Sequence, residues 1–335
     1  MYNSIITSTG YYVPENIVTN DDLSKLMDTS DAWIQERTGI QQRHFATRGK
    51  DTTTSMGVRA AQMAMEKAKI NKEDIDFLIF ATLSPDYYFP GCGVLAQKEL
   101  GLHTVGALDI RNQCSGFIYA LSVADQFIKT GMYKNVLVIA SEMQSPALDL
   151  TTRGRNMAVL FGDGAGAAVL SRSEDNGKGI LSSHLHSEGA HAEELAILTP
   201  GVGKKWVTDL LKENDPEDTS YFPYMNGQFV FKNAVVRFSE VIIEGLKANK
   251  LTESDINLFI PHQANLRISQ FIQQKFNLPD AKVFNNIQKY GNTTAASIAI
   301  ALAEAVEQDR IKENDIILLA AFGSGFTWGS VVIKW

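Results

Sequence analysis

The sequence repeats one pattern in its two halves, and this repeat limits the possible fold more than any other feature. Residues 72–80 read KEDIDFLIF and residues 253–261 read ESDINLFIP, so a charged turn precedes an apolar strand in both places. In the first half, a helical segment that follows Cys114 leads to the apolar run NVLVIA. In the second half, a helical segment that follows Asn292 leads to DIILLAA at a similar distance. Internal duplication of this kind indicates two similar α/β units.

The repeat predicts a division into residues 1–170 and residues 171–335, two similar halves that pack together as one unit. In open α/β sheets, the ends of strands and the starts of helices form the crevice in which ligands bind. Cys114 and Asn292 occupy equivalent points of the repeat, each at the start of a helix that follows a strand. We therefore expect both residues to belong to a ligand-binding crevice.

Apolar spacing predicts the individual elements of this α/β framework. Continuous or alternating apolar runs predict strands, and apolar residues three and four positions apart predict helices. The expected strands cover residues 4–8, 75–81, 105–110, 136–140 and 167–170, and the expected helices cover residues 20–27, 53–68 and 117–128. The strand at 105–110 is expected to be buried, and the helix at 20–27 is expected to be capped by Asn20 or Asp21.

Cys114 stands at the joint between the strand at 105–110 and the helix at 117–128. The unpaired N–H groups and the positive end of the helix dipole at such a position favour a thiolate over a thiol. The same N–H groups can bind a developing oxyanion. These properties suit a nucleophile; the alternative is a small buried apolar residue, which is the usual role of a cysteine in the cytosol.

Two residues of the second half offer neutral hydrogen-bond donors. His262 follows the strand-like run INLFIP and precedes a helical segment, a position that favours the neutral imidazole; alternatively, it only caps that helix. Asn292 stands in KYGNTTAAS before an Ala- and Ile-rich helix, where it is a good N-cap residue. In the functional interpretation its amide donates to an enolate oxygen, because an amide cannot lose a proton and is unsuited to act as a base.

Composition and charge argue against several classes of protein. The 335 residues are 44% hydrophobic and 21% charged, as in an ordinary globular protein. A formal net charge of −7 without a basic run argues against nucleic-acid binding. Two cysteines provide no disulfide framework, the N-terminal segment lacks the features of a signal peptide, and no apolar run is long enough to span a membrane. We therefore expect a cytoplasmic protein.

Four motifs together resemble a known family. They are the cysteine in NQCSGF, the histidine in PHQAN, the asparagine in YGNTTAAS and the C-terminal FGSGFTWGS. This set is similar to the signature of the ketoacyl synthase III group of condensing enzymes, and the similarity runs nearly end to end, from YYVPENIVTN to the final strand. The resemblance implies the thiolase fold, a duplicated five-layer αβαβα architecture, and a homodimer.

The resemblance also implies a decarboxylative Claisen condensation without a cofactor. Cys114 is expected to accept an acyl group from the substrate acyl-CoA, while backbone N–H groups of Cys114 and Ser324 hold the oxyanion. Malonyl-acyl carrier protein is expected to bind with its thioester carbonyl between His262 and Asn292. Ser324 departs from the FGGG turn that is frequent in the family, which keeps a backbone donor but leaves the shape of the tunnel open at that point.

Further residues match family positions in the CoA site. Trp33 and Arg153 match the pair that holds the adenine of CoA by stacking and a cation–π contact. Arg37 matches a residue near the CoA phosphates, and Asn265 matches a contact of the pantetheine arm.

Two more matches concern protein partners. Arg267 matches an arginine that docks the acidic carrier protein; the alternative is a solvated surface charge. Phe89, in YYFPG, matches a loop residue that reaches into the acyl pocket of the other subunit; the alternative is an aromatic ring that covers its own core.

Three other features are not expected to carry chemistry. GDGAGA at 162–167 resembles a nucleotide-binding fingerprint, but a strand rather than a helix follows it. His184, His186 and His191 have no evident carboxylate or cysteine partners, so no metal site is expected. Residues 210–221, LLKENDPEDTSY, belong to a long region at 192–226 and are expected to form a surface insertion, or alternatively a lid over the CoA entrance.

Two other functions are compatible with the catalytic residues. The order Cys, His, Asn also occurs in papain-like cysteine hydrolases, although the internal duplication has no place in that fold. A sibling enzyme of a specialised pathway would share the catalytic residues while joining the acyl group to a β-ketoacyl thioester, or transferring it to oxygen or nitrogen.

Overall fold

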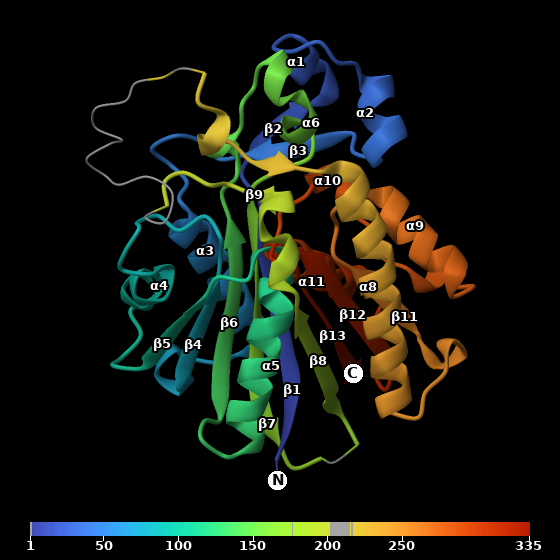
Figure 1. Cartoon of the computed structure of the whole chain (residues 1–335). Coiled ribbons are helices and arrows are strands. Elements are labelled where there is room, and N and C mark those ends of the chain that lie inside the picture. Colours follow the sequence, from blue (N-terminus) through green and yellow to red (C-terminus); the bar gives the residue numbers. More distant parts are fainter. Residues whose placement is uncertain (1, 176, 202–214, 216) are drawn as a thin grey trace.

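A computed structural model of the chain describes residues 2–175, 177–201, 215 and 217–335. Its strands form two large sheets (Figure 1). The first has the order β1 (Asn3–Tyr12), β7 (Gly164–Ser173), β6 (Asn135–Glu142), β4 (Phe77–Ala81) and β5 (Gly106–Ile110). The second has the order β8 (Gly179–Ser187), β13 (Thr327–Lys334), β12 (Ile316–Gly323) and β11 (Leu258–Pro261).

The two sheets repeat one topology. In the first sheet, β1 and β6 both run antiparallel to β7, and β4 runs parallel to β6 and β5. In the second sheet, β8 and β12 both run antiparallel to β13, and β11 runs parallel to β12. A parallel bridge from Phe259 to Val283 occupies the place that β5 has in the first sheet. The repeat in the sequence therefore corresponds to a repeat in topology, whereas a division at residue 170 stays a prediction.

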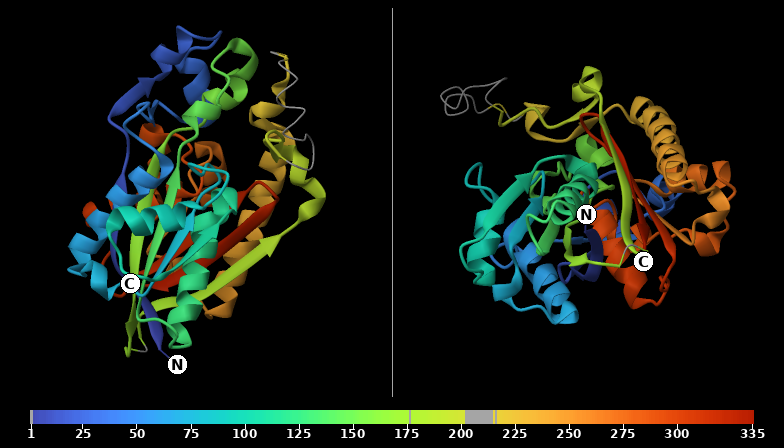
Figure 2. Two further views of the ribbon diagram at one scale, coloured as in Figure 1. Left: turned by 90° about the vertical axis from the view of Figure 1, so that its left-hand side faces the viewer. Right: turned by 90° about the horizontal axis from the view of Figure 1, so that it is seen from below.

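The helices complete five layers (Figures 1 and 2). Helices α5 (Gly116–Lys129) and α11 (Ala296–Glu307) lie between the two sheets. The outer face of the first sheet is covered by α3 (Thr53–Ala68) and α4 (Cys92–Leu100), and that of the second by α8 (Gly227–Ala248) and α9 (Leu266–Lys275). Leu121 of α5 and Leu302 of α11 share one buried cluster with Val138 of the first sheet and Leu319 of the second. This αβαβα arrangement is the one expected.

Shorter elements surround the end of the molecule at which α5 and α11 begin (Figure 1). They are β2 (Asn16–Thr19), α1 (Asn20–Ser24), α2 (Asp31–Thr38), β3 (Gln42–Phe45), α6 (Arg155–Ala158), β9 (Leu195–Ala196), β10 (Tyr224–Met225) and α10 (Ile287–Tyr290). The charged turns of the sequence repeat form the 3-10 turns Lys72–Asp74 and Glu253–Asp255. Within the described ranges, no helix has the length and apolar character that crossing a bilayer requires.

Two local expectations are wrong. Thr19, not Asn20 or Asp21, caps α1: its hydroxyl accepts from Asp22 N–H while the Asp22 carboxylate accepts from Thr19 N–H. The strand β5 is not buried, because among the described residues it pairs only with β4 and stands at the edge of its sheet. Leu108 is only partly buried there, and Asp109 is exposed.

The GDGAGA segment contributes packing and not a nucleotide site. It enters β7, the strand against which α11 packs. A Cβ added to Gly166 would lie 2.5 Å from the Cβ of Ala299 on α11, so only glycine permits this approach of the helix to the sheet. The close contact between β7 and α11 therefore explains the small residues in this motif.

We predict that Gly166→Ala lowers the free energy of unfolding by about 1–3 kcal/mol, because the added methyl group forces α11 away from β7. Urea unfolding measures this change. Gly189→Ala is the matched control, since a Cβ at Gly189 meets no heavy atom within 4 Å. Equal stability of the two variants would contradict the packing argument.

Candidate active site

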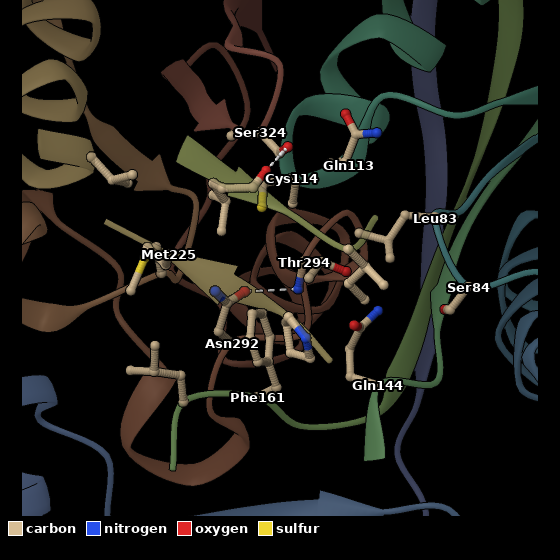
Figure 3. Close-up of a pocket in the computed structure, with 18 of the residues that line it drawn as sticks. Leu83, Ser84, Gln113, Cys114, Gln144, Phe161, Met225, Asn292, Thr294 and Ser324 are labelled. Carbon is tan, nitrogen blue, oxygen red and sulfur yellow. Dashed lines mark hydrogen bonds between the residues drawn. The ribbon is translucent and has the colours of Figure 1, made fainter. Parts of the chain in front are cut away.

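A cavity of about 620 Å³ opens where the two halves meet, and Cys114, His262 and Asn292 all line it. Ser324 lines the same cavity. Figure 3 shows Cys114, Ser324, Asn292 and Thr294 grouped around it. The structure thus brings together four residues that lie far apart in the sequence, although their catalytic roles stay predictions.

Cys114 lies in the 3-10 turn Gln113–Ser115, directly before α5. The backbone N–H groups of Cys114 and Ser324 both lower the pKa of its thiol, so both lie within reach of the sulfur. Gly323 makes this possible, because a Cβ there would lie 2.7 Å from the Cβ of Cys114. The two amides that the resemblance assigned to the oxyanion therefore flank the reactive atom.

The protonation state of Cys114 differs from the expectation. Burial and the charge of Glu142 raise the pKa of the thiol to about 12, and the two N–H groups offset only part of this rise. The helix dipole was expected to favour a thiolate, but a dipole at a helix start contributes only about 0.3–1 kcal/mol. Removal of the sulfur from water costs more than that, so the resting residue is a neutral thiol.

His262 follows β11 and is almost fully buried. Burial lowers its pKa to about 3, so the imidazole is neutral near pH 7. Its Nδ1 lies 2.6 Å from Ser297 Oγ. Because that oxygen already accepts from Gln263 N–H, the Ser297 hydroxyl is free to donate to Nδ1, an assignment that leaves the ring proton on Nε2.

The Nε2 atom of His262 has no hydrogen-bond partner within the described part of the chain. The alternative that His262 caps the next helix is wrong, because α9 begins at Leu266 and Asn265 caps it. A buried polar atom that faces a cavity without a protein partner suits a ligand.

Asn292 is held by both its backbone and its side chain. Its N–H donates to Leu160 O at 2.8 Å, and its carbonyl accepts from Gly162 N–H at 3.1 Å. Its Oδ1 accepts from Thr294 N–H at 2.9 Å, the dashed line in Figure 3. The N-cap alternative is wrong, since α11 begins at Ala296 with Ala295 as its N-cap. With the amide oxygen occupied, Nδ2 is the group left to donate to a ligand.

Of the predicted CoA residues, Asn265 lines the cavity, whereas Trp33 and Arg37 lie on α2 and Arg153 lies in the 3-10 turn Thr152–Gly154. The guanidinium of Arg37 lies 4.5 Å from the ring centroid of Trp33, and that of Arg155 lies 4.9 Å from it. Arg153 instead donates from Nε to Asp149 at 2.7 Å. Sequence reasoning did not single out Arg155, and whether Trp33 and Arg153 together hold the adenine of CoA stays a prediction.

Asn265 lines the cavity while both ends of its amide make local contacts. Its Oδ1 accepts from Arg267 N–H at 2.9 Å and its Nδ2 donates to Arg37 O at 2.9 Å. Arg267 is exposed in the first turn of α9. Phe89 is 81% exposed, so the alternative that it covers its own core is wrong.

The histidines of β8 have a carboxylate partner that sequence reasoning missed. Glu244 of α8 lies 3.3 Å from Nδ1 of His184 and 2.6 Å from Nε2 of His186. His191 packs instead against Phe229, with ring centroids 4.8 Å apart. The described ranges contain no group of three or more His, Cys, Asp or Glu side chains arranged to hold a metal ion.

The predicted insertion at 210–221 falls partly outside the described residues, which omit 202–214 and 216. Of the region around it, Leu195, Tyr221 and Met225 line the cavity. Whether the segment forms an insertion or a lid stays a prediction.

The architecture and the site define a class, the condensing enzymes of the thiolase fold, and comparisons with known proteins specify the family. Residues 108–189 match the model of 3-oxoacyl-[acyl-carrier-protein (ACP)] synthase III, and residues 246–335 match the model of its C-terminal part. The beta-ketoacyl-[acyl-carrier-protein] synthase III of Caldanaerobacter subterraneus subsp. tengcongensis is 46% identical over 98% of this chain and 97% of its own.

Comparison with solved structures supports the same family. The crystal structure of 3-oxoacyl-[acyl-carrier-protein] synthase III from Aquifex aeolicus VF5 superposes with a TM-score of 0.90, at 44% identity, over 99% of this chain and 100% of that one. The priming beta-ketosynthase of the R1128 polyketide biosynthetic pathway superposes with a TM-score of 0.89 at 30% identity, over 99% and 96% of the two chains. The chain belongs to the 3-oxoacyl-[acyl-carrier-protein] synthase III family and is an acyltransferase of the condensing type. The papain-like alternative is therefore wrong.

We predict that the burial of neutral His262 makes stability depend on pH. The folded pKa lies below the unfolded value of about 6.5, so the unfolded chain binds a proton first as the pH falls. Between about pH 6.5 and pH 5 this group alone removes about 2 kcal/mol of stability. Unfolding free energies of the wild type and His262→Gln across this range measure the effect; parallel curves would contradict it.

Proposed function

We propose that this enzyme condenses an acyl-CoA primer with malonyl-acyl carrier protein to give a 3-oxoacyl thioester, CoA and carbon dioxide. The observation that carries the proposal is the arrangement around one cavity. Two backbone N–H groups interact with the sulfur of Cys114. On the same cavity, His262 Nε2 has no hydrogen-bond partner within the described part of the chain, and Asn292 Nδ2 is able to donate. The relatives are named beta-ketoacyl-[acyl-carrier-protein] synthase III and 3-oxoacyl-[acyl-carrier-protein] synthase III, and these names describe the same condensation.

In the first step, the sulfur of Cys114 attacks the thioester carbonyl of acyl-CoA. The charge that develops on the carbonyl oxygen is stabilised by the N–H groups of Cys114 and Ser324. The tetrahedral species then collapses: the bond from carbon to the CoA sulfur breaks, and CoA leaves with the proton that the Cys114 thiol has lost. Because Cys114 is a neutral thiol at rest, this proton must leave as the new bond forms.

In the second step, the carbonyl oxygen of the malonyl thioester accepts hydrogen bonds from His262 Nε2 and Asn292 Nδ2. The bond to the carboxylate breaks, carbon dioxide leaves, and its electron pair forms an enolate on that oxygen. Both donors are uncharged, so they stabilise the enolate without protonating it outright. The enolate carbon then attacks the acyl-Cys114 carbonyl, a new carbon–carbon bond forms, and Cys114 leaves as a thiolate that takes up a proton.

Exposed and half-buried groups suggest the partners. Trp33 and Arg153 would hold the adenine of CoA, while the guanidinium groups of Arg37 and Arg155, which lie beside the Trp33 ring, suit its phosphates. Arg267 is exposed on α9 and offers a cation to an acidic carrier protein. No cofactor is needed for this chemistry. Both cysteines are free, and a thiol nucleophile favours a reducing compartment such as the cytoplasm.

We also propose a homodimer built on the edge of the first sheet. The strand β5 leaves one edge of that sheet unpaired. The loop between β4 and α4 exposes Tyr87, Tyr88 and Phe89, three adjacent large aromatic residues. An open strand edge beside an apolar patch suits a second copy of the chain, in which the two sheets continue across the interface and Phe89 reaches the acyl site of the partner.

We predict that Asn292→Ala slows decarboxylation of malonyl-acyl carrier protein by about 100-fold or more, because the enolate loses a preorganised donor. Acylation of Cys114 by acyl-CoA should change far less, since that step uses the backbone donors. Radiolabelled carbon dioxide release and intact-protein mass spectrometry follow the two steps. Unchanged decarboxylation would contradict the role of this amide.

The same mass measurement, made with acyl-CoA primers of two to twelve carbons, identifies the primer, and Cys114→Ala should show no adduct. Acylation followed by transfer to a β-ketoacyl thioester, oxygen or nitrogen acceptor, with no reaction of malonyl-acyl carrier protein, would favour the sibling enzyme of a specialised pathway. The 30% identity to a priming synthase of a polyketide pathway keeps that alternative in the test.

We predict that Phe89→Asp weakens the dimer at least tenfold, because a charge replaces an aromatic side chain at the centre of the proposed contact. Analytical ultracentrifugation measures the dissociation constant. Phe271→Asp is the control, because Phe271 is also an exposed aromatic residue but belongs to α9, which covers the outer face of the second sheet. An equal effect of both substitutions, or a monomeric wild type, would contradict the proposed interface.

A further inference from the structure

Glu142, the last residue of β6, is a fully buried carboxylate that does not line the cavity. Its oxygens accept from the hydroxyls of Thr82 and Ser84 at 3.1 and 2.6 Å, and from Leu83 N–H at 3.2 Å. Two longer contacts come from Gln144 Nε2 at 3.3 Å and Ala295 N–H at 3.4 Å.

All five groups around Glu142 present a proton to it, and none of them is a cation. Burial raises the pKa of the carboxyl, while the interactions with Ser84, Thr294, Leu83 and Thr82 lower it. A protonated carboxyl would have to donate its own proton to one of these groups, and among them only the hydroxyls of Thr82 and Ser84 can accept it. The arrangement therefore fits the ionised form. Burial of this charge costs free energy, and the surrounding hydrogen-bond donors offset that cost.

Ala295 links this carboxylate to Asn292. Thr294, between them, has a φ of 45°, a left-handed conformation that costs a non-glycine residue energy. Its N–H donates to Asn292 Oδ1, and the next N–H, that of Ala295, donates to Glu142 Oε1. Two consecutive amides of the strained turn thus have one acceptor each, and the first of these bonds fixes the direction of the Asn292 amide.

We propose that Glu142 is a positioning residue for the decarboxylation step: its carboxylate anchors the turn at Thr294 and Ala295 so that Asn292 presents Nδ2 to the malonyl thioester. This inference rests on the proposed function, because it assigns Asn292 to that step. The chain of contacts also crosses the molecule, since Glu142 belongs to the first sheet and Ala295 precedes a helix of the second half.

The carboxylate of Glu142 also acts on Cys114, where its negative charge disfavours the thiolate. Its charge is the second cause, after burial, of the raised pKa of the thiol. The other ionisable side chains that line the cavity are Tyr88, Arg111, Tyr221 and His262, and His262 is neutral. Removal of the charge at Glu142 should therefore make the thiol easier to ionise while it disturbs Asn292.

The experiment uses Glu142→Gln in the full-length enzyme and follows two half-reactions. Decarboxylation of malonyl-acyl carrier protein should fall about tenfold, because the amide NH₂ of glutamine cannot accept from the backbone donors and the turn loses its anchor. Alkylation of Cys114 by iodoacetamide should become roughly threefold faster at pH 8, with its pH profile moved to lower pH. A merely structural defect could also expose the buried thiol and speed its alkylation, but it would not move the pH profile to lower pH.

Asp125→Asn is the matched control. Asp125 is also a buried carboxyl, paired with Lys129 on α5, but it lies about three turns along the helix from Cys114. Its loss should leave the ratio of the two half-reaction rates unchanged. Glu142→Asp provides a second test if the glutamine variant does not fold: it keeps the charge but shortens the reach to Ala295, so decarboxylation should fall while the alkylation profile stays in place.

Decarboxylation that falls in the glutamine variant while the alkylation profile moves to lower pH would support the proposal. A parallel loss of both reactions, an alkylation profile that stays in place in the glutamine variant, or unchanged decarboxylation in either Glu142 variant would overturn it. A wild-type enzyme that neither takes up an acyl group on Cys114 nor releases carbon dioxide from malonyl-acyl carrier protein would overturn the proposed function itself, so the two failures are distinguishable.

Discussion

The packing of two helices between two sheets is the constraint on which the rest of this structure depends. Helices α5 and α11 reach the sheets closely because small residues line the contacts; a Cβ at Gly116, the first residue of α5, would lie 3.2 Å from Ala295 and 3.3 Å from Ala81. The starts of both helices therefore meet at one point. Since Cys114 and Asn292 stand just before these starts, the close packing of the two helices also brings these two residues to the same cavity.

The duplication then gives each helix start a different neighbour. Before α5, Cys114 faces the turn at Gly323 and Ser324, which follows β12 of the second half and supplies a backbone N–H group. Before α11, the turn at Ala295 faces Glu142, which ends the equivalent strand β6 of the first half. The start of α5 thus holds a neutral nucleophile among backbone donors, whereas the turn before α11 meets a buried carboxyl of the first half. The two helix starts are equivalent in the repeat but differ in the charge of their neighbours.

Burial sets the electrostatics of the site. The thiol of Cys114 and the imidazole of His262 are both uncharged near neutral pH, because the surrounding protein penalises either ion more than local dipoles favour it. Neutral groups suit a reaction in which charge appears only transiently on substrate oxygens, since fixed donors then stabilise the transition state more than the resting state. A membership in the family of 3-oxoacyl-[acyl-carrier-protein] synthase III is consistent with this arrangement.

The sequence by itself determined the α/β class, the repeat, most elements such as the helix at 53–68, and the residues Cys114, His262 and Asn292 that line the cavity, because these depend on local spacing and on long motifs. Only the tertiary structure decided the neutral state of the thiol, the arginine beside Trp33, the exposed position of β5 and the contacts of Glu142. Each of these depends on groups that are distant in the chain and on how much water the fold excludes. Local sequence patterns contain neither distance nor burial, and both the pKa of a buried group and the partner of a side chain follow from those two quantities.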